Sequence, residues 1–325
     1  MIVRNLTIST FIFALIFLLS CGDGGNQNQS ESLQGEIRID GSSTVYPITE
    51  AIAEEFRIDQ PDVKVTVGVS GTGGGFGKFG RGEIDINDAS RPIKEQEATD
   101  AKNNTIGFVE LKVAYDGLVV VANKSNTWLN EITVEELKTI WEPGAQDRIT
   151  RWNQVNPSWP AEEFNLYGPG IASGTYDYFT EAVVGESGSS RGDYTASEDD
   201  NVLVQGIAGD KNGLGFFGLA YYEESKNKLK LIGVRSGGAG VWPSEETIKN
   251  GTYTPLSRPV FIYVTDAAIK QPHVSAFVNF YLDNASVLVP DVGYIPLTDQ
   301  EYQTEKAKLL QFASGGGAHS AKESL

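Results

Sequence analysis

The amino-acid sequence predicts an α/β fold built on mostly parallel sheets. Short alternating apolar stretches precede stretches with apolar residues at helical spacing, and runs rich in Ser, Thr and Gly lie between them. This strand–loop–helix order is typical of parallel sheets flanked by helices, which bind ligands at the loops after the strands.

The first part of the chain shows this order three times. Strands are predicted at 36–40, 63–69 and 84–86. A helix follows the first of them, because Ile48, Ile52 and Phe56 recur at helical spacing, and Pro61 ends it. A glycine-rich segment at 70–80 follows the second strand, and a loop at 87–92 follows the third.

The remaining elements are predicted from their apolar patterns. Strands are expected at 118–121 and 258–265, and helices at 134–141, 176–184 and 274–282. The aromatic, turn-rich segments 141–145 and 152–160 are expected to be loops.

Three segments combine a preceding strand, a Ser/Thr/Gly run and a following helix. They are Gly-Ser-Ser-Thr at 41–44, Ser-Gly-Thr-Gly-Gly at 70–74 and Ser-Gly-Thr at 173–175. Each would place hydroxyls and unpaired backbone N–H groups at a helix N-terminus, which attracts anions. One such run alone could equally be a helix cap. Three in one chain favour a site for a tetrahedral oxyanion.

Arg91 is the candidate cation for such a site. It follows the third strand in the segment Asp-Ile-Asn-Asp-Ala-Ser-Arg at 85–91, and its planar guanidinium suits oxyanions. The alternative is a surface ion pair.

Together these motifs resemble the phosphate-binding (PstS-like) protein of the Pst phosphate ABC transporter. The resemblance rests on the segments 40–47, 70–76, 85–92, 173–179 and 191–201, and it covers the chain from about residue 35 to about residue 309. It implies a two-lobed class II periplasmic-binding-protein fold with two hinge strands, each lobe holding a mostly parallel sheet flanked by helices. It also implies a function, which is to bind inorganic phosphate and deliver it to permease subunits.

Carried over position by position, the resemblance implies a set of phosphate contacts. They fall on Ser43, Thr44, Val45, Ser70, Thr72, Ser90, Arg91, Ser173, Gly174 and Thr175. Many family members carry an arginine and an acid before the last Ser-Gly-Thr, but this chain reads Pro-Gly-Ile-Ala at 169–172. Arg191 is a possible substitute for that arginine.

Selectivity requires one more residue, because phosphate near neutral pH carries a proton and sulfate does not. A hydrogen-bond acceptor facing the ligand would therefore favour phosphate. Asp88 is the first candidate, since it is expected in the loop, where Arg91 would keep it ionised. Asp85 and Asp40 are the next candidates, followed by the acidic segment 198–200.

The N-terminus has the features of a bacterial lipoprotein signal. Arg4 precedes an apolar run at 11–19, and Leu-Leu-Ser-Cys at 18–21 resembles a lipobox, which would place a lipid on Cys21. The expected domains are a signal peptide at 1–20, a flexible tether at 21–34 and a disordered tail at 314–325. One lobe is expected at 35–113 with 257–313, and the other at 114–256.

Composition narrows the alternatives. The net charge of −17 argues against nucleic-acid binding. Two histidines and one cysteine make a histidine-dependent triad or a Cys/His zinc site improbable, so we expect no enzyme, no cofactor and no metal. The alternatives are a binding protein for sulfate, molybdate or tungstate, a secreted phosphatase, and a surface protein without a ligand. The expected form is a monomer attached to the membrane by its lipid alone.

Overall fold

The helices and strands of the computed structural model follow the predicted order, and the model describes residues 33–171, 173–197 and 199–315. The strands are β1 (Gly35–Gly41), β2 (Val63–Val67), β3 (Ile86–Ala89), β4 (Phe108–Asn123), β5 (Glu131–Thr133), β6 (Asn165–Pro169), β7 (Thr195–Ser197), β8 (Gly213–Gly218), β9 (Leu229–Arg235), β10 (Ser257–Thr265) and β11 (Ile295–Pro296). The α-helices are α1 (Tyr46–Asp59), α2 (Gly71–Phe79), α3 (Glu95–Asn103), α4 (Val134–Trp141), α5 (Trp152–Val155), α6 (Gly174–Phe179), α7 (Asp200–Gly209), α8 (Leu219–Ser225), α9 (Glu245–Lys249), α10 (Pro272–Asp291) and α11 (Asp299–Ala313). A 3₁₀ turn, η1 (Pro143–Ala145), follows α4, and a π-helical turn, η2 (Thr180–Val184), follows α6.

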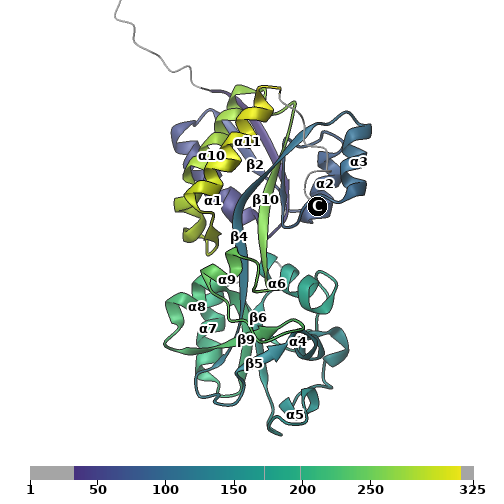
Figure 1. The fold of residues 1–325 in the computed structure, drawn as a ribbon, viewed down its shortest axis with the longest axis vertical. Coiled ribbons are helices and arrows are strands. Elements are labelled where there is room, and N and C mark those ends of the chain that lie inside the picture. Colours follow the sequence, from purple (N-terminus) through teal and green to yellow (C-terminus); the bar gives the residue numbers. More distant parts are fainter. Residues whose placement is uncertain (1–32, 172, 198, 316–325) are drawn as a thin grey trace, which may run out of the picture. The chain divides into compact units, whose positions relative to one another are not determined.

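The long strand β4 runs through both lobes of the fold (Figure 1). In the first lobe, β1 pairs in parallel with β2 and β3, while β10 is antiparallel to β3 and to the first part of β4. In the second lobe, β6 pairs in parallel with β7 and β8, while β8 is antiparallel to β4 from Leu118 onward. The predicted α/β fold with a parallel core in each lobe is confirmed. The residue limits given above for the two lobes stay a prediction.

Helices on both faces of the first lobe's sheet hold the ends of its strands in place. On one face, α1 packs against α10, with the rings of Phe56 and Phe277 edge to face at 5.2 Å. On the other, Phe76 of α2 packs against Tyr263 of β10 at 4.9 Å. This burial of aromatic surface positions the first turns of α1 and α2 beside the carboxyl ends of β1 and β2.

Some predicted boundaries were wrong. Asp88 was expected in a loop, but it pairs with Gly41 and Ile262 inside β3 and is fully buried. The segment 152–160, expected to be a loop, begins with the short helix α5. The expected signal peptide, Cys21, the tether up to residue 32 and the tail from residue 316 lie outside the described residues.

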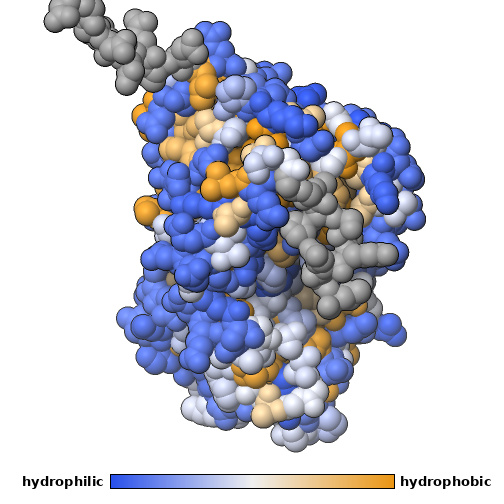
Figure 2. Space-filling model, turned by 45° about the horizontal axis from the view of Figure 1, so that its top comes forward, coloured by the Kyte–Doolittle hydropathy of each residue, from blue (hydrophilic) through white to orange (hydrophobic). Residues whose placement is uncertain are grey.

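The surface matches the acidic, polar composition. Hydrophilic residues cover most of the face shown in Figure 2, and hydrophobic residues are scattered among them in small groups. Within the described ranges, no helix is both long and apolar enough to cross a membrane.

Candidate functional site

Two of the three Ser/Thr/Gly runs meet directly, one from each lobe. Thr44, just before α1, donates a hydrogen bond from Oγ1 to the carbonyl oxygen of Gly174 at 3.1 Å. Ser43 donates from Oγ to the Oδ2 atom of Asp177 in α6 at 3.0 Å. Ser173 caps α6 through the backbone N–H of Thr175. The first and third runs therefore lie at the contact between the lobes.

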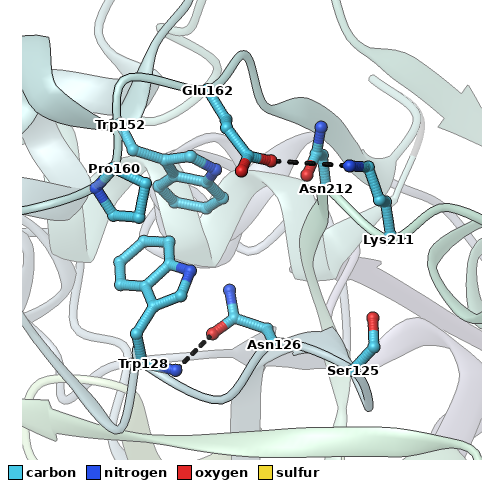
Figure 3. Close-up of a pocket in the computed structure, with 8 residues that line it drawn as sticks. All are labelled: Ser125, Asn126, Trp128, Trp152, Pro160, Glu162, Lys211 and Asn212. Carbon is cyan, nitrogen blue, oxygen red and sulfur yellow. Dashed lines mark hydrogen bonds and ion pairs between the residues drawn. The ribbon is translucent and has the colours of Figure 1, made fainter.

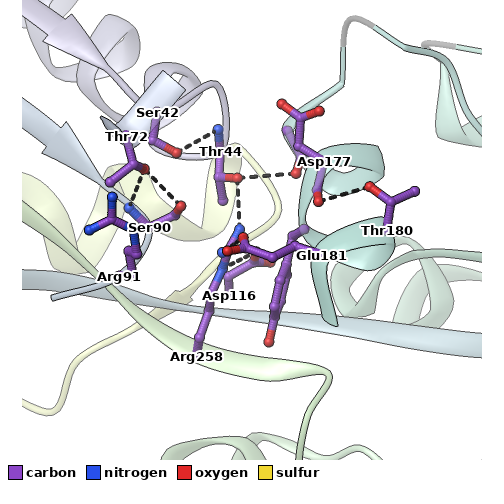
Figure 4. Close-up of polar contacts among 12 residues, drawn as sticks. Ser42, Thr44, Thr72, Ser90, Arg91, Asp116, Asp177, Thr180, Glu181 and Arg258 are labelled. Atoms are coloured by element: carbon purple, nitrogen blue, oxygen red, sulfur yellow. Dashed lines mark hydrogen bonds and ion pairs between the residues drawn. The ribbon is translucent and has the colours of Figure 1, made fainter. Parts of the chain in front are cut away.

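The remaining run lies beside them, at the same edge of the first lobe's sheet. The hydroxyls of Thr72 and Ser90 are 3.0 Å apart, and the backbone N–H of Ser90 donates to Thr72 Oγ1 at 3.1 Å. The backbone N–H of Ser70 donates to the carbonyl of Gly41, and that of Ser42 to the carbonyl of Asp88. Figure 4 shows Ser42, Thr44, Thr72 and Ser90 in one group. The carboxyl ends of three parallel strands thus gather hydroxyls and helix starts, as parallel sheets do at ligand sites.

Val45 and Gly71 shape the turns that lead into α1 and α2, and the backbone N–H of Val45 donates to the Ser42 carbonyl at 3.2 Å. Val45 is buried in the core at the position before α1. Gly71 begins α2 with a φ of +75°, a left-handed conformation that glycine adopts without strain. The run at 70–74 needs a glycine here to turn from strand into helix.

Arg91 is paired with another side chain and is not a free cation beside the Ser/Thr/Gly runs. Its Nη1 and Nη2 atoms donate to the two carboxylate oxygens of Glu97 at 2.9 and 2.8 Å, and Nη1 also donates to the Pro92 carbonyl. The hydrogen bond to Glu97 is the main reason why the pKa of Arg91 is raised. The ion pair that was the alternative for Arg91 is therefore present. A contact between Arg91 and the ligand stays a prediction.

The guanidinium of Arg191 is also fully engaged in hydrogen bonds within the chain. It is buried, with Nε and Nη2 donating to Asp193 at 2.5 and 2.7 Å and Nη1 donating to the carbonyls of Ile140 and Ile149. The hydrogen bond from Arg191 lowers the pKa of Asp193 to about 2. These partners hold Arg191 between α4 and neighbouring loops of the second lobe, and none of them belongs to the three runs.

Two of the three candidate acceptors, Asp85 and Asp40, are paired with other residues of the first lobe. Asp85 accepts hydrogen bonds from the Arg38 backbone and guanidinium at the start of β3. Burial raises the pKa of Asp40, but hydrogen bonds from Lys78 and Ser70 outweigh burial, so its pKa is lowered overall. Glu198 lies outside the described residues.

Asp88 faces the core between β3 and α1. Its Oδ1 atom accepts from Thr49 Oγ1 at 3.0 Å, while Oδ2 has no hydrogen-bond partner among the described residues. Burial raises the pKa of Asp88 to about 8 despite the bond from Thr49. The expectation that Arg91 keeps Asp88 ionised is therefore wrong, because Arg91 pairs with Glu97 and Asp88 lies in a region that disfavours charge.

Sequence reasoning missed Arg258, at the start of β10. Its Nη2 atom donates to Thr44 Oγ1 at 3.0 Å (Figure 4). The Cζ atom of its guanidinium lies 3.5 Å from the ring centre of Tyr178. It also forms ion pairs with Asp116 at 3.7 Å and with Glu181 at 3.6 Å. The sequence feature that could have indicated Arg258 is a single charged residue at the start of an apolar strand. It was interpreted only as the beginning of that strand.

A surface pocket of about 220 Å³ lies in the second lobe, away from these runs. Figure 3 shows Trp128 and Trp152 on one side of it and the ion pair of Glu162 and Lys211 on another. No group of three or more His, Cys, Asp or Glu side chains that could hold a metal occurs in the described part of the chain.

Comparison with known proteins identifies the family. Residues 26–285 match the model of the PBP superfamily domain. The chain is 53% identical to protein SphX of Synechococcus elongatus, over 82% of this chain and 79% of SphX. It is 39% identical to the phosphate-binding protein PstS of Staphylococcus saprophyticus, over 93% of this chain and 92% of that protein.

A solved structure agrees with these relatives. A possible phosphate-binding protein from Planctomyces limnophilus has a TM-score of 0.83 and 47% identity, covering 86% of this chain and 99% of that one. The chain therefore belongs to the PBP superfamily and, within it, to the PstS-like phosphate-binding proteins. The expected class II periplasmic-binding-protein fold is confirmed.

Proposed function

We propose that this chain binds inorganic phosphate between its two lobes, outside the cytoplasm, and delivers it to the permease of an ABC transporter. The observation that carries the proposal is the meeting of the runs at 41–44 and 173–175 across the lobes, with Thr72 and Ser90 beside them. Names of similar proteins, among them phosphate-binding protein PstS, support phosphate as the ligand.

The proposed site works through hydroxyls and backbone dipoles. The first turns of α1 and α2 begin at the runs, and a helix start presents N–H groups without helical partners. The hydroxyls of Ser43, Thr44 and Ser70, which donate to Asp177, Gly174 and Asp40 in this structure, would turn toward a bound anion. Thr72, Ser90, Ser173 and Thr175 add further hydroxyls, and Val45 and Gly174 contribute backbone. Such a site binds and releases an anion without covalent chemistry. We accordingly propose a binding protein that is not an enzyme and that uses neither cofactor nor metal.

Calorimetry with inorganic phosphate tests this proposal. The soluble chain from residue 22 should bind one phosphate, and Thr44→Val should weaken binding by about 10- to 150-fold, because a lost hydrogen bond to a charged partner costs about 1.5–3 kcal/mol. Thr99→Val, at an exposed position on α3, is the matched control and should bind like the unaltered chain. A preparation freed of anions that gives no heat with phosphate, or that prefers sulfate or molybdate, would refute phosphate as the ligand.

We further propose that Cys21 carries a lipid anchor. Two acyl chains hold a protein on a membrane stably, whereas one chain holds it only marginally. Cys21→Ser should leave the precursor uncleaved, because the lipid on this cysteine precedes cleavage, and immunoblot should show the larger precursor in place of the mature chain. Ser30→Ala, in the segment that follows, should be cleaved and fractionate like the unaltered chain. A Cys21→Ser chain that has the same size and the same distribution between membrane and soluble fractions as the unaltered chain would contradict the anchor.

A further inference from the structure

Arg258 has more hydrogen-bonding capacity than its neighbours use. A guanidinium carries five N–H donors. The Nη2 atom of Arg258 donates to Thr44, Nε has no hydrogen-bond partner in the described part of the chain, and Nη1 faces Glu181 at 3.6 Å. That distance is too long for a hydrogen bond. By contrast, Arg91 makes three hydrogen bonds and Arg191 makes four.

The surroundings of Arg258 hold its guanidinium in one orientation. Its Cζ atom lies over the ring of Tyr178, 3.5 Å from the ring centre, and the Tyr178 hydroxyl donates to the Pro255 carbonyl at 2.7 Å. On its inner side, the buried Asp116 lies 3.7 Å from Nε. Only 13% of the Arg258 side chain is exposed. A cation held in this way loses little conformational entropy when it binds an anion.

Glu181 lies on the open side of the same guanidinium. It belongs to η2 in the second lobe, and 51% of its side chain is exposed, whereas Asp116 on the other side is buried. Its negative charge also contributes to the raised pKa of Arg91. Glu181 is therefore an anionic group placed between the lobes, within reach of the two arginines nearest the Ser/Thr runs.

We propose that Arg258 is the cation of the anion site and that Glu181 competes with the ligand for it. The inference rests on the proposed phosphate binding and assigns the cation that Arg91 and Arg191 were expected to supply. Thr44 joins the two parts, because it contacts Arg258 from one side and Gly174 of the second lobe from the other. A phosphate at the three runs would meet Nη1 of Arg258 on the side of Glu181, whereas the buried Nε stays beside Asp116. The carboxylate of Glu181 would repel this phosphate.

Phosphate calorimetry on substituted chains tests this assignment. Arg258→Gln should lower the affinity by about 10- to 150-fold, as expected for the loss of a charge-assisted bond, and Arg258→Lys should fall between it and the unaltered chain. Arg151→Gln removes an exposed ion pair with Glu163 in the second lobe and should leave the affinity unchanged. Thermal unfolding without phosphate is measured alongside, so that a loss of fold is distinguished from a loss of binding.

Glu181→Gln should change the phosphate affinity in the opposite direction. This test remains valid even if the Arg258→Gln chain does not fold. Removing the competing carboxylate should raise the phosphate affinity about two- to fivefold, the range of a partly exposed ion pair. An unchanged or weaker affinity would overturn the competing role of Glu181, and a folded Arg258→Gln chain with unaltered affinity would overturn the role of Arg258. If the unaltered chain binds no phosphate, the proposed function itself fails, which is a different result.

Discussion

Gly174→Ala is expected to reduce phosphate affinity by about 100-fold while each lobe stays folded. A Cβ atom at this position would lie 2.3 Å from the backbone nitrogen of Thr44 and 2.4 Å from its Cα. Neither atom can move away at low energetic cost, because both belong to the backbone just before α1. Overpacking costs up to about 3 kcal/mol, and about 1.4 kcal/mol corresponds to a tenfold change in affinity.

The comparison variant is Gly209→Ala. It makes the same substitution in the second lobe, at the end of α7, where an added Cβ would meet nothing within 4 Å. Both variants are titrated with phosphate in a calorimeter, and circular dichroism checks their folding. If Gly174→Ala binds as tightly as Gly209→Ala, the contact between the runs at 41–44 and 173–175 is not part of the bound state.

Asp88→Asn is expected to abolish a strong pH dependence of the free energy of unfolding. Burial raises the pKa of Asp88 to about 8 in the folded chain, from a reference value of 3.8. Between these values the unfolded chain has lost the proton while the folded chain keeps it. Stability therefore falls as pH rises from about 4 to about 8, by up to about 1.4 kcal/mol per pH unit, and levels off above. Asparagine cannot ionise, so the variant lacks this slope and is the more stable chain near pH 8.

Urea unfolding at several pH values between 4 and 9 measures the effect. Asp62→Asn, at an exposed position, is the control and should keep the slope of the unaltered chain. Asp116, whose pKa burial raises to about 6, contributes a slope of its own, so the slopes of the two chains are compared at each pH. Equal slopes in Asp88→Asn and in the unaltered chain would show that the pKa of Asp88 is not raised by folding. Its role as the acceptor for the phosphate proton would then regain support.

The local elements and the positions of the Ser/Thr/Gly runs could be predicted from the sequence. The helix Val134–Trp141 has the bounds that its apolar spacing indicates, and the runs at 41–44 and 70–74 follow strands as expected. Periodicity and capping chemistry act over a few residues, so the sequence records them directly. The α/β fold class depends on the order of such elements and was predicted for the same reason.

The partners of the charged side chains depend on the folded chain. Arg258 and Thr44 are 214 positions apart in the chain, and no local pattern relates them. The direction in which Asp88 points depends on the register of β3, since a shift of one residue would turn its side chain to the opposite face. The order of residues was therefore enough to indicate which hydroxyls and helix starts can bind an anion. Which arginine keeps N–H donors without a partner depends on the tertiary structure alone, because ion pairs form between the charges that the folded backbone brings together.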